Sequence, residues 1–209
     1  MTVRGHLSIM ASRTDIINLA AVYISEARSI DPSTDTSETA RTLDFLYDFS
    51  RKEVLRAHTW GCAKEDVLIN ADGTAPTFKW ARAYTLPVDF VRMVSIQEVD
   101  IDAINPPRYE IKGRKILTSE AAPLKVTYIK DLETVGDMDD MLIKSIALKL
   151  AAEACLSRTD SIPMAEFILN RYNTFVEEAK FTDTMERRRA LDAPHLQSDW
   201  DNSHFGGGA

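Results

Sequence analysis

The stretch MLIKSIALKLAAEACL, residues 141–156, decides the fold that the sequence predicts. Wound into a helix, this stretch is apolar on most faces, and a helix of that kind must be covered from several sides. Its small side chains, among them Ala147 and Ala151, allow neighbouring helices to approach closely. We therefore expect this segment to be the central helix of a bundle.

Three other segments show apolar residues at the spacing of a helix, and we expect them to surround the central one. The first runs from about 14 to 28, with Ser12 or Thr14 as its N-cap. The second runs from about 37 to 58, and the last runs from about 161 to 191. Together with the central segment they predict two helix pairs.

The second of these segments has two clearly different faces. Leu43, Tyr47 and Val54 lie on one apolar stripe, which we expect to be buried. Arg51 and Lys52 are charged, and we expect both to stay in water. This pattern predicts an amphipathic helix on the outside of the bundle.

Between residues 62 and 130 the pattern changes to short runs of apolar residues separated by turn signals, which predicts strands. The clearest run is YEIKGRKILT, residues 109–118. Gly113 and Arg114 suit a two-residue type II′ turn, because glycine tolerates the positive φ of its first position. We expect a β-hairpin here.

The predicted fold class is α+β, dominated by a helical bundle, with an inserted small antiparallel β region and an extended C-terminal arm. The expected parts follow one another along the chain. They are an N-terminal helix pair at 1–60, the β region at 61–130, a C-terminal helix pair at 131–191 and a flexible arm at 192–209.

The last residues, DWDNSHFGGGA at 199–209, place two large rings in a polar, glycine-rich segment. Glycine loses the most backbone entropy on ordering, so this segment is not expected to fold alone. Trp200 and Phe205 can each bury roughly 150–250 Å². Two interpretations stay open: a strap that orders on a partner or neighbouring subunit, or an end whose rings rest on their own domain.

Composition and motifs give no sign of an enzyme or a metalloprotein. The formal net charge of −7 disfavours a general nucleic-acid binder, because phosphate contacts need clustered Lys and Arg. No apolar run reaches the roughly 20 residues that span a bilayer, so we expect no membrane partner. His58 and Cys62 lie four residues apart, but no second His or Cys pair completes a metal site. We expect no catalytic residues, no metal and no cofactor.

Three stretches and one helix end carry a resemblance to a known family. The stretches are DIINLAA at 15–21, YTLPVDFVR at 84–92 and DWDNSHFGGG at 199–208, and the helix end is LRAHTW at 55–60. In this order they resemble the podovirus tail tubular protein A family, the head-to-tail adaptors of short-tailed phages. His204 departs from the pattern, since an arginine is more usual there.

The resemblance implies a structural adaptor of the virion tail that is assembled in the host cytoplasm. Twelve copies would form a ring between the portal protein and a tail nozzle of the tubular protein B type. The ring would support the tail fibre and line part of the channel through which genomic DNA leaves during ejection, without sequence-specific binding. An acidic chain suits such a channel, because like charges repel.

The resemblance also suggests where the partners bind. Trp200, His204 and Phe205 in the arm, with Arg187 and Arg188 before it, are expected to dock on the portal or on a neighbouring subunit. The two arginines equally suit the negative end of a helix dipole.

The hairpin residues Lys112, Gly113, Arg114 and Lys115 are expected to face the nozzle or fibre, or else to form an ordinary solvated turn. The alternatives are another portal-binding head-completion connector, a non-viral helical scaffold protein, or an enzyme whose site forms between subunits.

Overall fold

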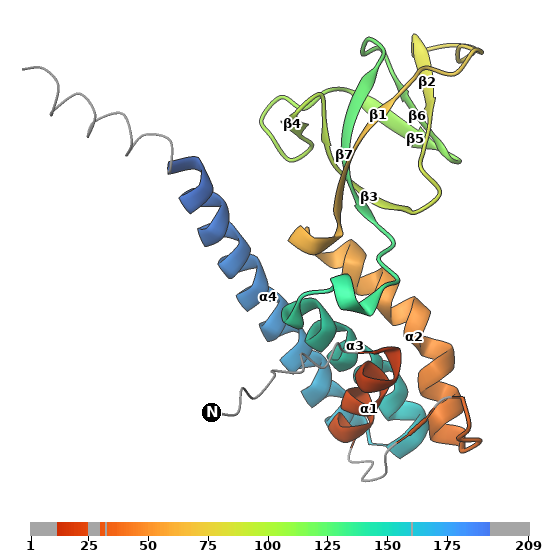
Figure 1. Cartoon of the computed structure of the whole chain (residues 1–209), viewed down its shortest axis with the longest axis vertical. Helices are drawn as coiled ribbons and strands as arrows, with labels where there is room; N and C mark the ends of the chain where they lie inside the picture. Colours follow the sequence, from red (N-terminus) through yellow and green to blue (C-terminus); the bar gives the residue numbers. More distant parts are fainter. Residues whose placement is uncertain (1–11, 25–29, 32, 160, 193–209) are drawn as a thin grey trace, which may run out of the picture.

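The helices gather at one end of the molecule and the strands at the other (Figure 1). This computed structural model describes residues 12–24, 30–31, 33–159 and 161–192, and the elements below are those of the described residues. The helices are α1 (Arg13–Tyr23), α2 (Glu38–Ala57), α3 (Asp140–Thr159) and α4 (Ile162–Asp192). The strands are β1 (Lys64–Ile69), β2 (Arg82–Thr85), β3 (Phe90–Ile96), β4 (Val99–Asp100), β5 (Tyr109–Lys112), β6 (Lys115–Thr118) and β7 (Leu124–Lys130).

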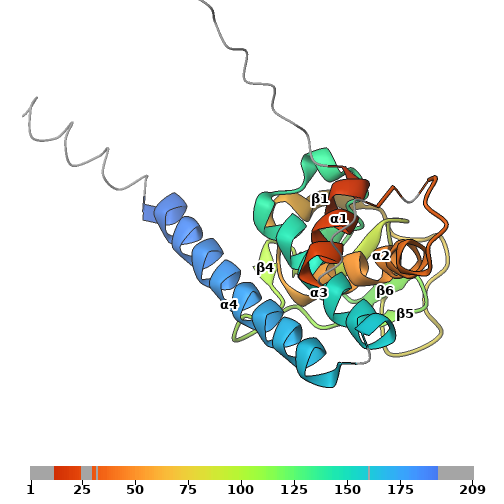
Figure 2. The ribbon, with the colours of Figure 1, turned by 90° about the horizontal axis from the view of Figure 1, so that it is seen from below.

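Helix α3 is the centre of the helical part. It packs against α1, α2 and α4, while α2 and α4 lie on opposite sides of it (Figures 1 and 2). Its buried residues include Leu142, Ile146, Leu150 and Cys155. The prediction of a central helix at 141–156 is therefore confirmed. In Figure 1, α4 runs on well past the other helices.

The first helix begins with a capping box. The Asp15 backbone N–H donates to Ser12 Oγ at 3.2 Å, and the Ser12 backbone N–H donates to Asp15 Oδ2 at 2.8 Å. These bonds satisfy two N–H groups that have no partner inside the helix. Ser12 is thus the N-cap, one of the two residues that the sequence offered.

The β part consists of two antiparallel sheets. One has the strand order β1-β7-β3-β4, and the other has the order β2-β6-β5. Their apolar side chains form a hydrophobic core separate from that of the helices. Its fully buried members include Tyr84, Ile96, Ile116 and Leu124.

The prediction of a fold dominated by a helical bundle is wrong. The described residues form four α-helices and seven strands in two sheets, so the chain is α+β with a substantial β part. The strands do not lie on the bundle as a small insertion, because they bury an apolar core of their own. Short strands with charged residues between the apolar ones conceal this second core in the sequence.

The expectation that Arg51 stays in water is also wrong, because its side chain is buried. Its Nη1 donates to the Leu132 carbonyl at 2.8 Å and forms an ion pair with Asp131 Oδ1 at 2.9 Å. Both partners directly follow β7. The guanidinium therefore ties α2 to the point where the chain leaves the β part.

Candidate functional site

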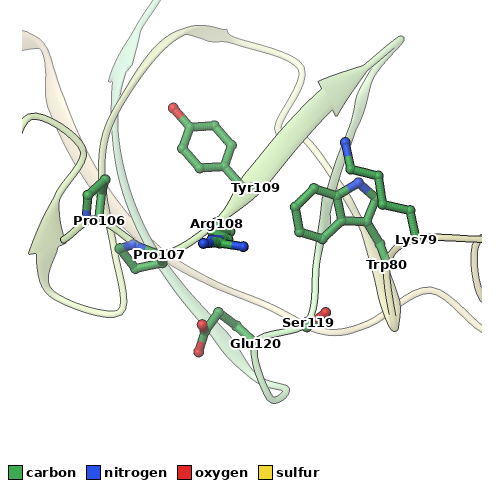
Figure 3. A pocket seen from close by; sticks show the side chains of 8 residues that line it. All are labelled: Lys79, Trp80, Pro106, Pro107, Arg108, Tyr109, Ser119 and Glu120. Carbon is green, nitrogen blue, oxygen red and sulfur yellow. The ribbon is translucent and has the colours of Figure 1, made fainter.

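The three-stranded sheet β2-β6-β5 carries two open hollows that share Lys79 and Trp80. The larger, of about 780 Å³, is shown in Figure 3. Opposite Trp80, the view places Tyr109 and the Pro106–Pro107 pair. The remaining lining residues are Arg108, Ser119 and Glu120. Aromatic rings beside charged groups are common in surfaces that bind other molecules.

One wall of this hollow is held in place by hydrogen bonds from two residues of strand β2. Arg82 Nη1 donates to the carbonyls of Ser119 and Glu120 at 3.2 and 3.1 Å. The Tyr84 hydroxyl donates to the same Glu120 carbonyl at 2.8 Å. The loop after β6 is therefore fixed to the sheet, and the hollow has a formed wall.

Glu110 fixes the shared wall of the two hollows. Its Oε2 accepts from Trp80 Nε1 at 3.0 Å and from Lys79 Nζ at 2.9 Å. The Lys79 ammonium also lies 4.9 Å from the centroid of the Trp80 ring. Two hydrogen bonds lower the pKa of Glu110. The larger effect comes from the Trp80 indole and the next largest from the Lys79 ammonium. At neutral pH the carboxylate is therefore charged and orients the indole.

Lys79 has a φ of +74°, in the left-handed region that non-glycine residues rarely adopt. A backbone of that kind costs free energy and persists only when its surroundings hold it. Here the Trp80 backbone N–H donates to the Phe78 carbonyl at 2.9 Å, which closes a three-residue turn centred on Lys79. The conformation places the lysine and the indole side by side on the rim.

The smaller hollow has a volume of about 320 Å³. It is lined by residues of the predicted hairpin and by aromatic rings that the sequence analysis did not single out. Lys112 and Lys115 line it together with Phe78 and Trp80. Phe78 is 77 % exposed, which is unusual for a phenylalanine. The hairpin is therefore one edge of a larger surface of rings and lysines, which we call the β2-β6-β5 surface.

The hairpin itself has the predicted turn. Gly113 has a φ of +62°, and Arg114 is not among the described residues with a positive φ, as a type II′ turn requires. Arg114 donates from Nη2 to the Pro87 carbonyl, and its own carbonyl accepts from the Leu86 N–H at 2.9 Å. The turn is thus bound to its own domain.

The charges of the hairpin are only partly available to a partner. Lys115 Nζ pairs with Asp72 Oδ2 at 2.7 Å, and the hydrogen bond from Lys115 holds the pKa of Asp72 below its usual value. Lys112 is exposed and lines the smaller hollow. Of the predicted hairpin residues, Lys112 is therefore the one best placed to meet another molecule.

The docking arm falls largely outside the described residues. Trp200, His204 and Phe205 lie there. Arg187 and Arg188 fall within α4, but their side chains also lie outside the described part. The structure therefore leaves the predicted arm contacts as predictions.

A second kind of exposed surface lies on the helices. Phe45 and Phe49 on α2 are 70 % and 62 % exposed, and their ring centroids lie 5.6 Å apart. On α4, Phe167 and Phe181 are each 64 % exposed. The spacing of Phe45 and Phe49, one turn apart and opposite the Tyr47 stripe, is the sequence signal that could have revealed the first pair.

The described residues include no group of three His, Cys, Asp or Glu side chains that could hold a metal ion. The His58 ring packs edge-on against the ring of Trp60 at 4.9 Å. Cys62 Sγ lies 3.4 Å from Asp139 Oδ2, and burial raises the pKa of this thiol to about 11. A thiol of that kind is protonated at neutral pH and a poor nucleophile. In the same described ranges, no helix is both long and apolar enough to cross a membrane.

No model of a known protein family matches the chain, and no curated protein matches it either. The resemblance to phage adaptors therefore depends on the sequence stretches alone. Two of these segments lie where the two parts of the fold meet: 55–60 ends α2, and in 84–92 the Val91 carbonyl accepts from Arg56 Nη1 of α2 at 3.1 Å. Trp60, in the first, is buried and donates from Nε1 to the Val54 carbonyl at 2.9 Å.

Proposed function

We propose that the protein is a structural adaptor of a short-tailed phage, which forms a ring between the portal and the tail nozzle and lines part of the DNA exit channel. The observation that carries the proposal is the division of exposed rings between the two ends of one chain. Phenylalanines project from α2 and α4 at the helical end, and Phe78 projects with lysines at the β end. Exposed apolar groups gathered in this way are typical of interaction surfaces.

Each end suits a different contact. Helices on both sides of α3 offer lateral surfaces for neighbouring copies, and the β2-β6-β5 surface offers a site for a second component such as the nozzle or fibre. The net charge of −7 supports the passage of DNA without adhesion. We propose no enzymatic activity and no cofactor for this adaptor.

Native mass spectrometry of the purified protein, with and without purified portal rings, tests the proposal. We expect a complex with the portal that contains many copies of the chain. A stable small oligomer that ignores the portal would contradict the adaptor and favour the alternative of a non-viral scaffold. Binding to the portal without any nozzle attachment would favour the other alternative, a head-completion connector.

The two predicted docking sites are tested separately. Removal of the residues after Leu191 is expected to abolish portal binding, and unchanged binding would reject the arm as the portal anchor. Lys112→Glu is expected to weaken nozzle attachment while ring formation stays normal. Arg114→Glu is a weaker test, because Arg114 is bound to the Pro87 carbonyl of its own domain.

A further inference from the structure

Two aromatic rings lie on opposite sides of the larger hollow on the three-stranded sheet. Figure 3 shows the six-membered ring of the Trp80 indole turned toward Tyr109 and Arg108. Trp80 and Tyr109 are partly exposed, so part of each ring is open to another molecule. The volume of the hollow, about 780 Å³, lies within the roughly 300–1,000 Å³ of small-molecule sites. We call it the Trp80 hollow.

The sides of the Trp80 hollow are held in place by a buried hydroxyl group. Thr118 is fully buried, and its Oγ1 donates to the Arg108 carbonyl at 2.8 Å. The same oxygen accepts from the Glu120 backbone N–H at 3.3 Å. Trp80 is fixed separately, because its Nε1 donates to Glu110 at 3.0 Å. The hollow is therefore formed before a ligand arrives, which lowers the entropy cost of binding.

The side chains of Arg108 and Glu120 are available to a ligand. Among the described residues, these two form hydrogen bonds only through their backbone atoms. Ser119, which lies between them on the lining, adds an exposed hydroxyl. The hollow thus offers donors from the guanidinium, acceptors from the carboxylate and a hydroxyl that serves as both.

Charges of both signs surround the hollow, which disfavours a ligand with a charge of either sign. Lys79 and Arg108 are cations, and Glu120 is an anion. Glu110 adds a second carboxylate beside Trp80 and Lys79. A phosphate group would meet the two carboxylates, and a quaternary ammonium ion would meet the guanidinium. These charges therefore favour an uncharged polar ligand.

The backbone around the hollow offers little to a peptide. The carbonyls of Ser119 and Glu120 already accept from Arg82 at 3.2 and 3.1 Å. The Arg108 carbonyl already accepts from Thr118. An extended peptide gains affinity from main-chain hydrogen bonds. Because these carbonyls already have donors, the hollow favours a ligand that binds side chains and rings.

A sugar ring matches this combination of groups. It presents C–H groups on its flat faces, and these stack on the negative face of an aromatic ring. Its hydroxyls lie around the rim, where they donate to carboxylates and accept from guanidinium groups. The Trp80 Nε1–H is taken by Glu110, so the indole offers a ligand only its ring.

We propose that the Trp80 hollow binds a neutral oligosaccharide. Its sugar rings stack on Trp80 and Tyr109. Its hydroxyls bond to the Arg108 guanidinium and to the Glu120 carboxylate. This site goes beyond the proposed adaptor and does not depend on it, since the predicted nozzle contact Lys112 lines the smaller hollow.

Saturation-transfer NMR of the protein with neutral trisaccharides tests this site. The probes are cellotriose, maltotriose and triacetylchitotriose, which differ in linkage and in their N-acetyl groups. We expect transfer to the ring C–H protons of at least one probe, together with a shift of the Trp80 indole N–H signal. That signal is assigned by its loss in Trp80→Phe. No transfer to any of these probes would overturn the proposal.

Two single substitutions locate the binding. Arg108→Ala removes an exposed donor, and we expect the affinity for the bound probe to fall about tenfold, as for the loss of a hydrogen bond to a charged group. Tyr109→Ala removes a stacking ring and should weaken binding several-fold. The matched control is Phe78→Ala, an exposed ring of the smaller hollow, which should bind like the unaltered protein. Equal affinity of Arg108→Ala and the control would overturn the proposal.

Further outcomes separate this site from other ligands and from the adaptor. Binding of a decaproline peptide that is lost in Arg108→Ala, together with no binding of any trisaccharide, would overturn the saccharide and assign the hollow to a peptide. Portal binding without trisaccharide binding would keep the adaptor and reject this site. Trisaccharide binding without portal binding would keep this site and reject the adaptor.

Discussion

Arg51→Met is expected to weaken the connection between the helical and β parts. Methionine keeps much of the volume of the buried side chain but removes its charge and its donors. The Leu132 carbonyl then loses the hydrogen bond of 2.8 Å from Nη1, and Asp131 loses its ion pair of 2.9 Å. Both losses fall at the segment that leaves β7.

The loss of stability that we expect for Arg51→Met follows from the burial of the arginine side chain. Breaking a buried pair by removing one partner costs about 3–5 kcal/mol. Asp131 keeps the Lys52 ammonium at 3.2 Å, so its charge is not left alone. We therefore expect the lower end of that range, about 3 kcal/mol. For a chain of this size, that corresponds to a fall in Tm of roughly 6–12 °C.

Urea unfolding and thermal melts of the purified variant measure this loss. The matched control is Lys125→Met, which removes a cation paired at 2.5 Å with Glu98 where both side chains are exposed. That variant should lose less than about 1 kcal/mol, because solvent screens surface pairs. An Arg51→Met loss no larger than the control would refute the reasoning. Adding Asp131→Asn should restore part of the stability, since it removes the charge left without its main partner.

Three further predictions concern local features. Gly113→Ala is expected to cost about 1 kcal/mol in urea unfolding, because alanine is strained at a φ of +62°. Ser12→Ala should cost about 1 kcal/mol at neutral pH. Hydrogen bonds from Ser12 lower the pKa of Asp15, so this cost should shrink as the pH falls through that lowered pKa, and a constant cost down to pH 2 would contradict the assignment. Cys62 should react slowly with iodoacetamide at pH 8 and faster as the pH approaches its raised pKa of about 11. Rapid labelling at pH 7 would show that burial does not suppress the reactivity of this thiol.

The candidate site could be predicted only in part. The type II′ turn at Gly113 follows from two residues, because glycine at the first position determines the turn. The partners of Lys112 in the β2-β6-β5 surface could not be found in the same way. Phe78 and Trp80 lie more than thirty positions earlier in the chain, and the pairing of β2 with β6 brings them to the hairpin. Contacts between residues so far apart in the chain produce no periodic pattern in the local sequence from which they could be predicted.

The first helix was predicted to run to about residue 28, but α1 ends at Tyr23. The sequence by itself nevertheless determined where the helices begin, because a helix start depends on spacing and caps within a few residues. The segment 141–156 and the capping residue Ser12 are examples. Only the tertiary structure decided which side chains are covered. Arg51 is buried because the segment after β7 closes over it, and Phe45 is exposed because no element of its own chain covers that side of α2 within the described residues. Burial depends on which distant elements meet, and periodicity along one element does not contain that information.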